Sequence, residues 1–402
     1  MRVLYITHYG ILEPLGQTQI LPYLSGLATK GISVDILSFE KLQMLQDHSM
    51  VHAQSDRLRS LDIRWHPRAY RRSKFLPYLL ADVMVTAYEI RKRCVRDGID
   101  LLHCRSHVPS WMAWSATKRY CVPLLFDFRG LLAEEYVDSG LWKPGGAAFR
   151  LTKAFERRVA RGCAALVVLT EPARDYLQKA YSLDAHKMFI IPCCVDLAKF
   201  RAERSMASAP QRPLGVVYAG STSGRYRIKE MLDFFTLLLS LRPGSKFTIL
   251  SSGDSRPVRQ LVEKSGLSLS TVRVECLPAG GIPEVLAQQD LGLVFLNGDR
   301  ALLASSPTKL GEYLATGLIV VAENGLGDLR RILVDQRVGC LIDSGRRDTW
   351  KVAAEEALRL CDQPCAREGS RRAAATFFSL ADGIERYFTA YNYAVKRGAN
   401  PC

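Results

Sequence analysis

The chain has 402 residues, of which 48% are hydrophobic and 24% charged, and this composition is typical of a folded protein of about two to three domains. No apolar run reaches the ~20 residues of a membrane-spanning helix, which excludes an integral membrane protein. Eleven scattered cysteines without C-x-x-C spacing predict neither a disulfide framework nor a zinc site. The start, MRVLYITHYG, is typical of a buried strand rather than of a signal sequence, so we expect a cytoplasmic protein.

The net charge of +15 indicates an anionic partner: nucleic acid, anionic lipid or a phosphorylated small molecule. Charge alone does not choose among them. The basic residues are dispersed, and the sequence has no helix-turn-helix, RNA-recognition or zinc-finger pattern, so we expect no nucleic acid as partner.

Short apolar runs alternate with helix-length segments along the whole chain, which predicts an α/β protein with parallel sheets covered by helices. The first series lies at residues 3–10, 33–39, 100–106, 123–130, 164–170 and 188–196. The second lies at residues 214–220, 246–253, 272–278, 291–297, 317–323 and 338–343. We therefore expect two doubly wound, Rossmann-like domains at 1–200 and 214–380, a linker at 201–213, and a C-terminal helix at 381–402 that packs back on the body.

Ligands of such open sheets bind beyond the carboxyl ends of the strands, so we expect the site in an interdomain cleft. The first loop of this kind is HYGILEPLGQTQ, residues 8–19, which enters a helix near Gln17. Gly16 lets backbone approach closely, and the helix start favours an anion of the donor. A turn without any ligand is the alternative.

The second loop is YAGSTSGRYRIKEML, residues 218–232, after the first strand of the second domain. Arg225, Arg227 and Lys229 precede or open a helix, and such cations suit a diphosphate. The alternative is a solvated basic turn.

The third stretch is SSPTKLGEYLATGLIVVAENG, residues 305–325, a helix followed by a buried strand. Pro307 is expected at the first helical position, with Ser305 or Ser306 as the cap. Lys309 and the helix start would hold phosphate, and Glu312, one turn later, would bind a sugar diol. A surface ion pair between Lys309 and Glu312 is the alternative.

The order and spacing of several motifs resemble the retaining glycosyltransferases of family 4, which have the GT-B fold. The motifs are LGQTQILPYLSGLATKGISVDILSFEK, HCRSH, DFRGLLAEEY, VVLTEPARDYL, IIPCCVDLAKF and SSPTKLGEYLATGLIVVAENGLGD. The resemblance implies that Glu312 binds the ribose of a nucleotide-diphosphate sugar and that Lys229 and Arg225 bind its diphosphate. It also implies transfer with retention and without a metal or other cofactor, and Lys229, Lys309 and Arg225 would stabilise the leaving group.

The chain departs from the family pattern at three places. Ala304 stands where the family commonly has a glutamate, eight positions before Glu312. Arg225 and Lys229 are four positions apart, whereas five is usual, so either the loop is rebuilt or Arg227 substitutes. Asp127 and Arg129 follow the fourth strand, where a histidine is frequent.

Four residues are candidates for contact with the acceptor: His103, His107, Asp127 and Arg129. The resemblance implies a lipid-linked or saccharide acceptor, as in the synthesis of cell-envelope polysaccharide or glycolipid. Residues 64–93 carry basic and aromatic residues around an apolar helix, which indicates contact with the inner face of the cytoplasmic membrane through anionic lipids. A helix of the first domain with a solvated basic loop is the alternative.

Other functions remain open at this point. A sugar-nucleotide epimerase or a phosphorylase would share the fold, and a non-catalytic sugar-nucleotide-binding or nucleic-acid-binding protein would account for the charge. The products separate the first two from a glycosyltransferase, because only the transferase releases a free nucleotide together with a glycosylated acceptor.

Overall fold

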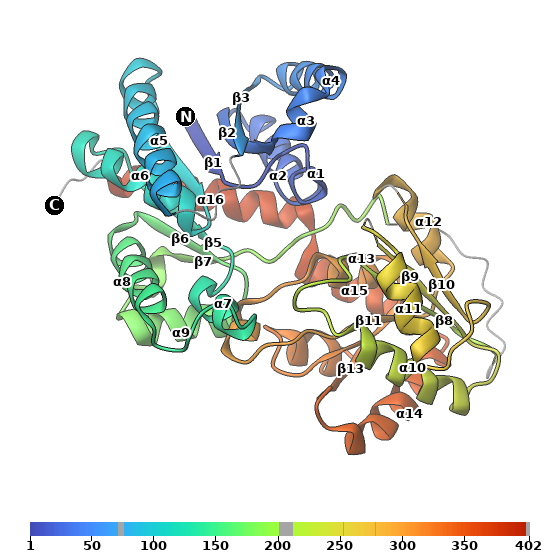
Figure 1. Cartoon of the computed structure of the whole chain (residues 1–402). Coiled ribbons are helices and arrows are strands. Elements are labelled where there is room, and N and C mark those ends of the chain that lie inside the picture. The colour runs from blue at the N-terminus through green and yellow to red at the C-terminus, as the bar shows by residue number, and fades with distance from the viewer. Residues whose placement is uncertain (71–75, 201–211, 252, 278, 399–402) are drawn as a thin grey trace. The chain divides into compact units, whose positions relative to one another are not determined.

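The computed structural model describes residues 1–70, 76–200, 212–251, 253–277 and 279–398 (Figure 1). The chain forms two compact units. The first comprises Met1–Val137, Trp142–Pro192 and Leu380–Cys402, and the second comprises Asp138–Leu141 and Cys193–Ser379. Residues 193–200 therefore group with the second unit and not with the expected first domain, and the C-terminal helix belongs to the first unit. Of the expected linker, residues 201–211 lie outside the described part.

The first unit contains a parallel sheet of seven strands, in the order β3-β2-β1-β4-β5-β6-β7. The strands are β1 (Arg2–Thr7), β2 (Ser33–Lys41), β3 (Ile63–Tyr70), β4 (Leu101–Arg105), β5 (Leu124–Phe128), β6 (Ala165–Val168) and β7 (Met188–Ile190). The six apolar runs of the sequence are confirmed as strands. The seventh, β3, is not among the predicted strands, because its residues form no apolar run.

The helices of the first unit connect these strands. They are α1 (Pro14–Gln19), α2 (Leu21–Ala28), α3 (Leu42–Gln46), α4 (His48–Arg59), α5 (Leu76–Arg96), α6 (His107–Tyr120), α7 (Leu132–Asp138), α8 (Ala147–Gly162), α9 (Glu171–Tyr181) and α16 (Leu380–Gly398). The chain ends in α16, which packs against α2 and against β4, β5, β6 and β7. Gly26 of α2 allows α16 to approach closely, because a Cβ atom at this position would lie 2.2 Å from Cδ1 of Ile384.

The second unit contains a parallel sheet of six strands, in the order β10-β9-β8-β11-β12-β13. The strands are β8 (Gly215–Ala219), β9 (Lys246–Leu250), β10 (Val272–Glu275), β11 (Leu291–Val294), β12 (Ile319–Glu323) and β13 (Gly339–Ile342). The α-helices are α10 (Ile228–Leu241), α11 (Arg256–Lys264), α12 (Ile282–Ala287), α13 (Thr308–Thr316), α14 (Trp350–Cys361) and α15 (Ala366–Phe378). All six strands expected here are confirmed.

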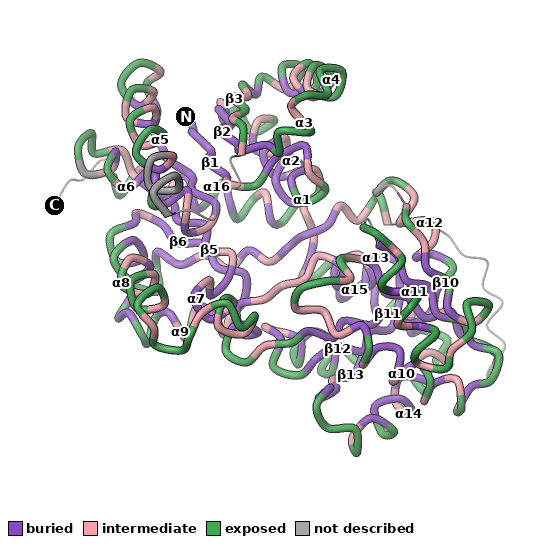
Figure 2. Tube along the Cα trace, in the orientation of Figure 1, coloured by how far each residue is buried: buried purple, intermediate pink, exposed green. Residues whose placement is uncertain are grey.

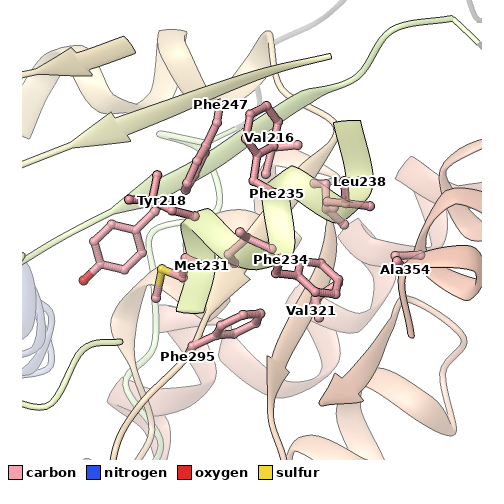
Figure 3. Packing of buried hydrophobic residues seen from close by; sticks show 14 of the residues in the cluster. Val216, Tyr218, Met231, Phe234, Phe235, Leu238, Phe247, Phe295, Val321 and Ala354 are labelled. Carbon is pink, nitrogen blue, oxygen red and sulfur yellow. The ribbon is translucent and has the colours of Figure 1, made fainter. Parts of the chain in front are cut away.

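The core of the second unit lies between its sheet and α10 and α14, and the strands are largely buried (Figure 2). Phe234 of α10 meets Phe295 edge to face at 5.5 Å between ring centres. Tyr218 lies at one rim of this cluster, and its hydroxyl points away from the other labelled side chains (Figure 3). The aromatic packing therefore ends in a polar group beside the loop that follows β8.

Within the described residues, no helix is both long and apolar enough to cross a membrane.

Candidate functional site

The strand order of the second sheet changes direction between β8 and β11, since β9 lies on one side of β8 and β11 on the other. In doubly wound sheets, a ligand crevice lies at this point, beyond the carboxyl ends of the two strands. The loop after β8 begins at Gly220, and α13 follows the loop after β11. These two segments supply the candidate site.

Tyr313 fixes the position of α13 against the sheet. Its hydroxyl accepts a hydrogen bond of 2.7 Å from the amide of Ala219, at the end of β8. Gly292 in β11 leaves room for the ring, because a Cβ atom there would lie 2.3 Å from Cδ2 of Tyr313. Lys309, one turn before Tyr313, is thereby held beside the loop that follows β8.

Lys309 is a buried cation without a hydrogen-bond acceptor. Its Nζ lies 4.1 Å from the ring centre of Tyr218 and 3.7 Å from that of Tyr226. Among the described residues, none accepts a hydrogen bond from this Nζ, although the side chain is only 6% exposed. Gly220 provides the space, since a Cβ atom there would approach Nζ to 2.6 Å. Burial lowers the pKa of Lys309 well below its usual value, and the charge of Glu312 opposes this only in part.

Glu312 lies one helical turn after Lys309 and is half-buried. Burial raises the pKa of Glu312 to about 7, against a smaller lowering effect from Lys309. The expected alternative of a surface ion pair is wrong, because Lys309 is buried and no Lys309–Glu312 pair forms within the described chain. Lys309 and Glu312 thus lie on one helix face, and within the described chain Lys309 Nζ has two aromatic rings beside it but no hydrogen-bond acceptor. Groups of this kind suit a phosphate and a diol.

The start of α13 differs from the expectation. Pro307 occupies the N-cap, one position earlier than expected, and no side chain caps the helix. Ser305 Oγ instead donates to the carbonyl of Ala301 at 3.0 Å. Ser306 Oγ accepts from the amide of Cys193 at 3.2 Å. The prediction of a serine cap is therefore wrong, and the first amides of α13 are left without a side-chain acceptor in the described structure.

The three cations after β8 do not converge on Lys309. Arg225 Nε donates to the carbonyl of Asn297 at 3.1 Å, and Arg227 donates to Oδ1 of the same residue at 2.9 Å. Lys229 lies on α10, 59% exposed, and pairs with Asp233 at 2.8 Å. Tyr226, between the two arginines, is the residue of this loop that contacts Lys309. The sequence predicted that this loop belongs to the site, but not that Tyr218 and Tyr226 contact Lys309. The position of these two tyrosines on either side of Gly220 was the available signal for that contact.

In the first unit, Gly16 serves the packing of its own chain. It is buried in α1, and a Cβ atom there would lie 2.4 Å from the carbonyl oxygen of Gly10 and 2.4 Å from Cα of Ile11. The preceding loop therefore fills the space beside Gly16 in which we expected an anion of the donor. Glu40 holds that loop, since its carboxylate accepts from the amides of Ile11 and Leu12 at 2.8 and 3.2 Å.

Three of the expected acceptor residues lie in a network under α16. Asp127 is fully buried and lies 3.5 Å from His103, 3.4 Å from Arg105 and 3.5 Å from Arg129. Tyr387 donates to Asp127 at 3.2 Å, and the Tyr391 hydroxyl lies 2.7 Å from Nδ1 of His103.

Burial would raise the pKa of Asp127, but the neighbouring arginines and the His103 hydrogen bond hold this pKa below its usual value. This placement argues against acceptor contact by His103 and Asp127, and Arg129 directs its guanidinium to the same carboxylate.

His107 begins α6 and belongs to a second buried network. Its Nε2 lies 2.8 Å from the carboxylate of Glu156, which also pairs with Lys153 at 2.6 Å and accepts from Tyr181 at 2.5 Å. Lys153 in turn pairs with Glu134 at 3.0 Å. With 3% exposure, His107 ties α6 to α8 rather than facing a ligand.

The segment expected to meet a membrane contains β3 and the helix α5, whose protein-facing side is mainly apolar. Of the described side chains of α5, Val83, Ile90 and Cys94 are buried together with Thr86. Glu89 pairs with Arg93 at 2.8 Å and with Arg68 of β3. Met84 and Tyr88 are 71% and 62% exposed, so α5 also leaves apolar side chains uncovered; residues 71–75 of this segment lie outside the described part.

Among the residues that the structure describes, no group of three or more histidine, cysteine, aspartate or glutamate side chains has an arrangement for a metal ion. The ten described cysteines are all free.

Comparison with known proteins agrees with the resemblance that the motifs indicated. The sequence model of Glycosyltransferase Family 4 matches residues 17–199. The chain is similar to this family over these residues. The chain is similar to the D-inositol 3-phosphate glycosyltransferase of Paenarthrobacter aurescens (strain TC1), with 26% identity over 327 residues, which cover 77% of this chain and 76% of that protein.

Solved structures agree with the fold. A glycosyltransferase from Rickettsia africae ESF-5 superposes with a TM-score of 0.70 and 15% identity, covering 98% of both chains. Alr3699/HepE of Anabaena, in complex with UDP and glucose, superposes with a TM-score of 0.70 and 13% identity, covering 97% of this chain and 98% of that one. The fold is GT-B, as the resemblance implied, and together with the family match it supports a glycosyltransferase.

Proposed function

We propose that this glycosyltransferase moves a sugar from a nucleotide-diphosphate sugar to a lipid-linked or saccharide acceptor, with retention and without a metal. The observation that carries the proposal is Lys309, a buried ammonium with no acceptor, at the sheet position where such folds bind ligands. A diphosphate oxygen would supply the missing acceptor. The relative from Paenarthrobacter is named as a glycosyltransferase, and the Anabaena neighbour binds UDP and glucose.

Each group of the site has a role in this proposal. The diphosphate lies against Lys309 and the uncapped amides of α13, and Gly220 lets it approach the backbone. Glu312 accepts hydrogen bonds from the ribose hydroxyls. Arg225 and Arg227 shape the loop through Asn297 and add positive potential, while Lys229 contributes from the surface.

The chemistry follows from charge development. The bond between the anomeric carbon and the diphosphate oxygen breaks, the acceptor oxygen bonds to that carbon on the same face, and the acceptor proton passes to the leaving phosphate. Negative charge grows on the diphosphate along this path, so cations and helix amides fixed at that place stabilise the transition state more than the ground state.

We also propose that the enzyme works in cell-envelope polysaccharide or glycolipid synthesis, in the cytoplasm and at the inner face of the membrane. The exposed apolar side chains Met84 and Tyr88 of α5 and the net charge of +15 support contact with anionic lipid.

A screen of UDP-, GDP- and ADP-sugars for thermal stabilisation tests the donor, because a ligand that binds only the folded state raises the midpoint of unfolding. We expect one nucleotide class to stabilise the protein, by about 2.7 kcal/mol at a hundred times its dissociation constant. Incubation with that donor and an acceptor should release free nucleoside diphosphate. An isomerised sugar nucleotide as the only product would replace the proposal with an epimerase.

A further inference from the structure

A surface pocket of about 450 Å³ lies between α6 and α8 of the first unit. It is lined by Trp114, Ala154, Arg157, Arg158, Arg161 and Gly162. The indole of Trp114 forms one wall and lies close to the end of α8, since a Cβ atom at Gly162 would meet Cη2 of Trp114 at 2.6 Å. The pocket therefore combines a flat aromatic wall with three guanidinium groups.

The three arginines of this pocket have no acidic partner. No carboxylate lines the pocket, and within the described chain none of Arg157, Arg158 and Arg161 forms an ion pair. Arg161 Nε donates to the carbonyl of Tyr181 at 3.0 Å, and the guanidinium of Arg157 lies 5.4 Å from the Tyr181 ring centre. Some other exposed arginines do pair with a carboxylate, as Arg256, Arg346 and Arg372 show.

The outward face of α8 is basic along its length. Arg150, Arg157, Arg158 and Arg161 are exposed (Figure 2). Glu156, which is the sole acidic residue of the helix, is fully buried and is engaged by His107 and Lys153. Like charges gathered without counter-charges repel one another, so an anion placed among them lowers the energy of the cluster.

We propose that this pocket binds a phosphate-bearing ligand. Guanidinium groups match phosphate oxygens with two parallel hydrogen bonds, and three arginines line this pocket. The pocket lies at the end of α8 that leads into β6, at the amino ends of the strands. The proposed sugar transfer takes place at the carboxyl ends of the strands. The pocket between α6 and α8 is therefore a second site, and ligand binding there does not depend on the proposed transfer. The phosphate is either that of a small soluble molecule or the headgroup of an anionic lipid.

Two probes distinguish these sources. Pyrophosphate, titrated calorimetrically, tests a soluble ligand, and sedimentation with phosphatidylcholine vesicles, with and without phosphatidylglycerol, tests a lipid headgroup. Both use Lys309→Met protein, so that the site in the second unit does not contribute. The test variant is R157Q/R158Q. The matched control, R119Q/R150Q, removes two exposed arginines from the same two helices, outside the pocket.

We expect R157Q/R158Q to weaken binding of one probe at least about tenfold and R119Q/R150Q to weaken it less than about threefold. Loss of pyrophosphate binding identifies a soluble phosphate, and loss restricted to the anionic vesicles identifies a headgroup. Equal losses in both double variants would mean a general positive field, and no binding of either probe would mean no site; each result overturns the proposal.

If R157Q/R158Q fails to fold, R157K/R158K is the second test variant, because it keeps the charge but loses the paired hydrogen bonds. It should show an intermediate loss of binding, and unchanged binding would again overturn the proposal.

Discussion

Lys309 and Glu312 have opposite charges and the spacing of a helical ion pair, yet in the described structure they do not pair, and Lys309 Nζ, although it lies beside two aromatic rings, has no hydrogen-bond acceptor. Burying an unpaired charge costs free energy, and folded proteins tolerate that cost mainly where function requires it. Two such groups on one helix face, beside a glycine that keeps space open, are best explained by a ligand that carries both a phosphate and a diol.

The role of Glu312 can be tested by Glu312→Gln. If the carboxylate binds the ribose, the variant should fold normally and bind the nucleotide sugar more weakly by about 1.5 to 3 kcal/mol, the range for hydrogen bonds to a charged group. Calorimetric titration measures this difference. Unchanged affinity would remove Glu312 from the donor site.

Glu312 should also make stability depend on pH. Its pKa is about 7 in the folded state against 4.5 as the reference value, so between these values the folded state holds more protons than the unfolded state. This contribution to stability therefore falls as the pH rises through that window and is lost above it. We expect the melting temperature of Glu312→Gln, relative to the original chain, to increase from pH 5 to pH 8. A difference that is constant or shrinks would mean that the carboxyl group titrates normally.

The sequence could predict the helix, Lys309 and Glu312, because proline, serine and a change from polar to apolar residues mark a helix start. It could not predict that Lys309 is buried between two rings, since Tyr218 and Tyr226 lie more than eighty positions away. For the same reason, the histidines were misjudged: His103 meets Tyr391 from the opposite end of the chain.

At the scale of elements, α16 depends on the Asp127 network for its anchorage. Asp127→Ala removes the carboxylate that faces buried Arg105 and that accepts from Tyr387 of α16, so we expect it to destabilise the protein by about 3 to 5 kcal/mol. Denaturant unfolding measures the loss. The control is Asp254→Ala, whose exposed partner is Arg256, and we expect it to leave stability almost unchanged. Equal effects would mean that the network does not anchor the helix.

Strand β3 shows why an edge strand escapes a search for apolar runs. It pairs with β2 alone, and of its residues IRWHPRAY only Ile63 is buried, so it contains no apolar run. Pro67 is tolerated because an edge strand leaves half of its backbone groups unpaired. Glu89 of α5 pairs with Arg68 of this strand.

The outward side of α5 predicts membrane contact that can be measured. M84S/Y88S removes two exposed apolar side chains and should lower sedimentation with phosphatidylglycerol vesicles by at least about threefold, because buried apolar area drives interfacial binding. Stability should change little, since both side chains are exposed. Val352→Ser, at a residue that is 71% exposed on α14, is the control. Equal binding by all three proteins would refute the contact.

At the scale of the whole molecule, the alternation of apolar runs and helix-length segments was enough to predict two parallel sheets, because twelve of the thirteen strands of the described chain coincide with such runs. The division into units was harder to predict. The chain returns to its first unit after Ser379, and no local pattern marks such a return.

The central claim is that Lys309 binds the leaving diphosphate. Turnover of Lys309→Met and Lys229→Met with the identified nucleotide sugar tests it most directly, because both variants lose one cation of the second unit, buried in one case and 59% exposed in the other. We expect Lys309→Met to lose at least about tenfold in turnover, equivalent to about 1.4 kcal/mol of transition-state stabilisation, and Lys229→Met to lose less than about threefold. Full turnover by Lys309→Met would contradict the account.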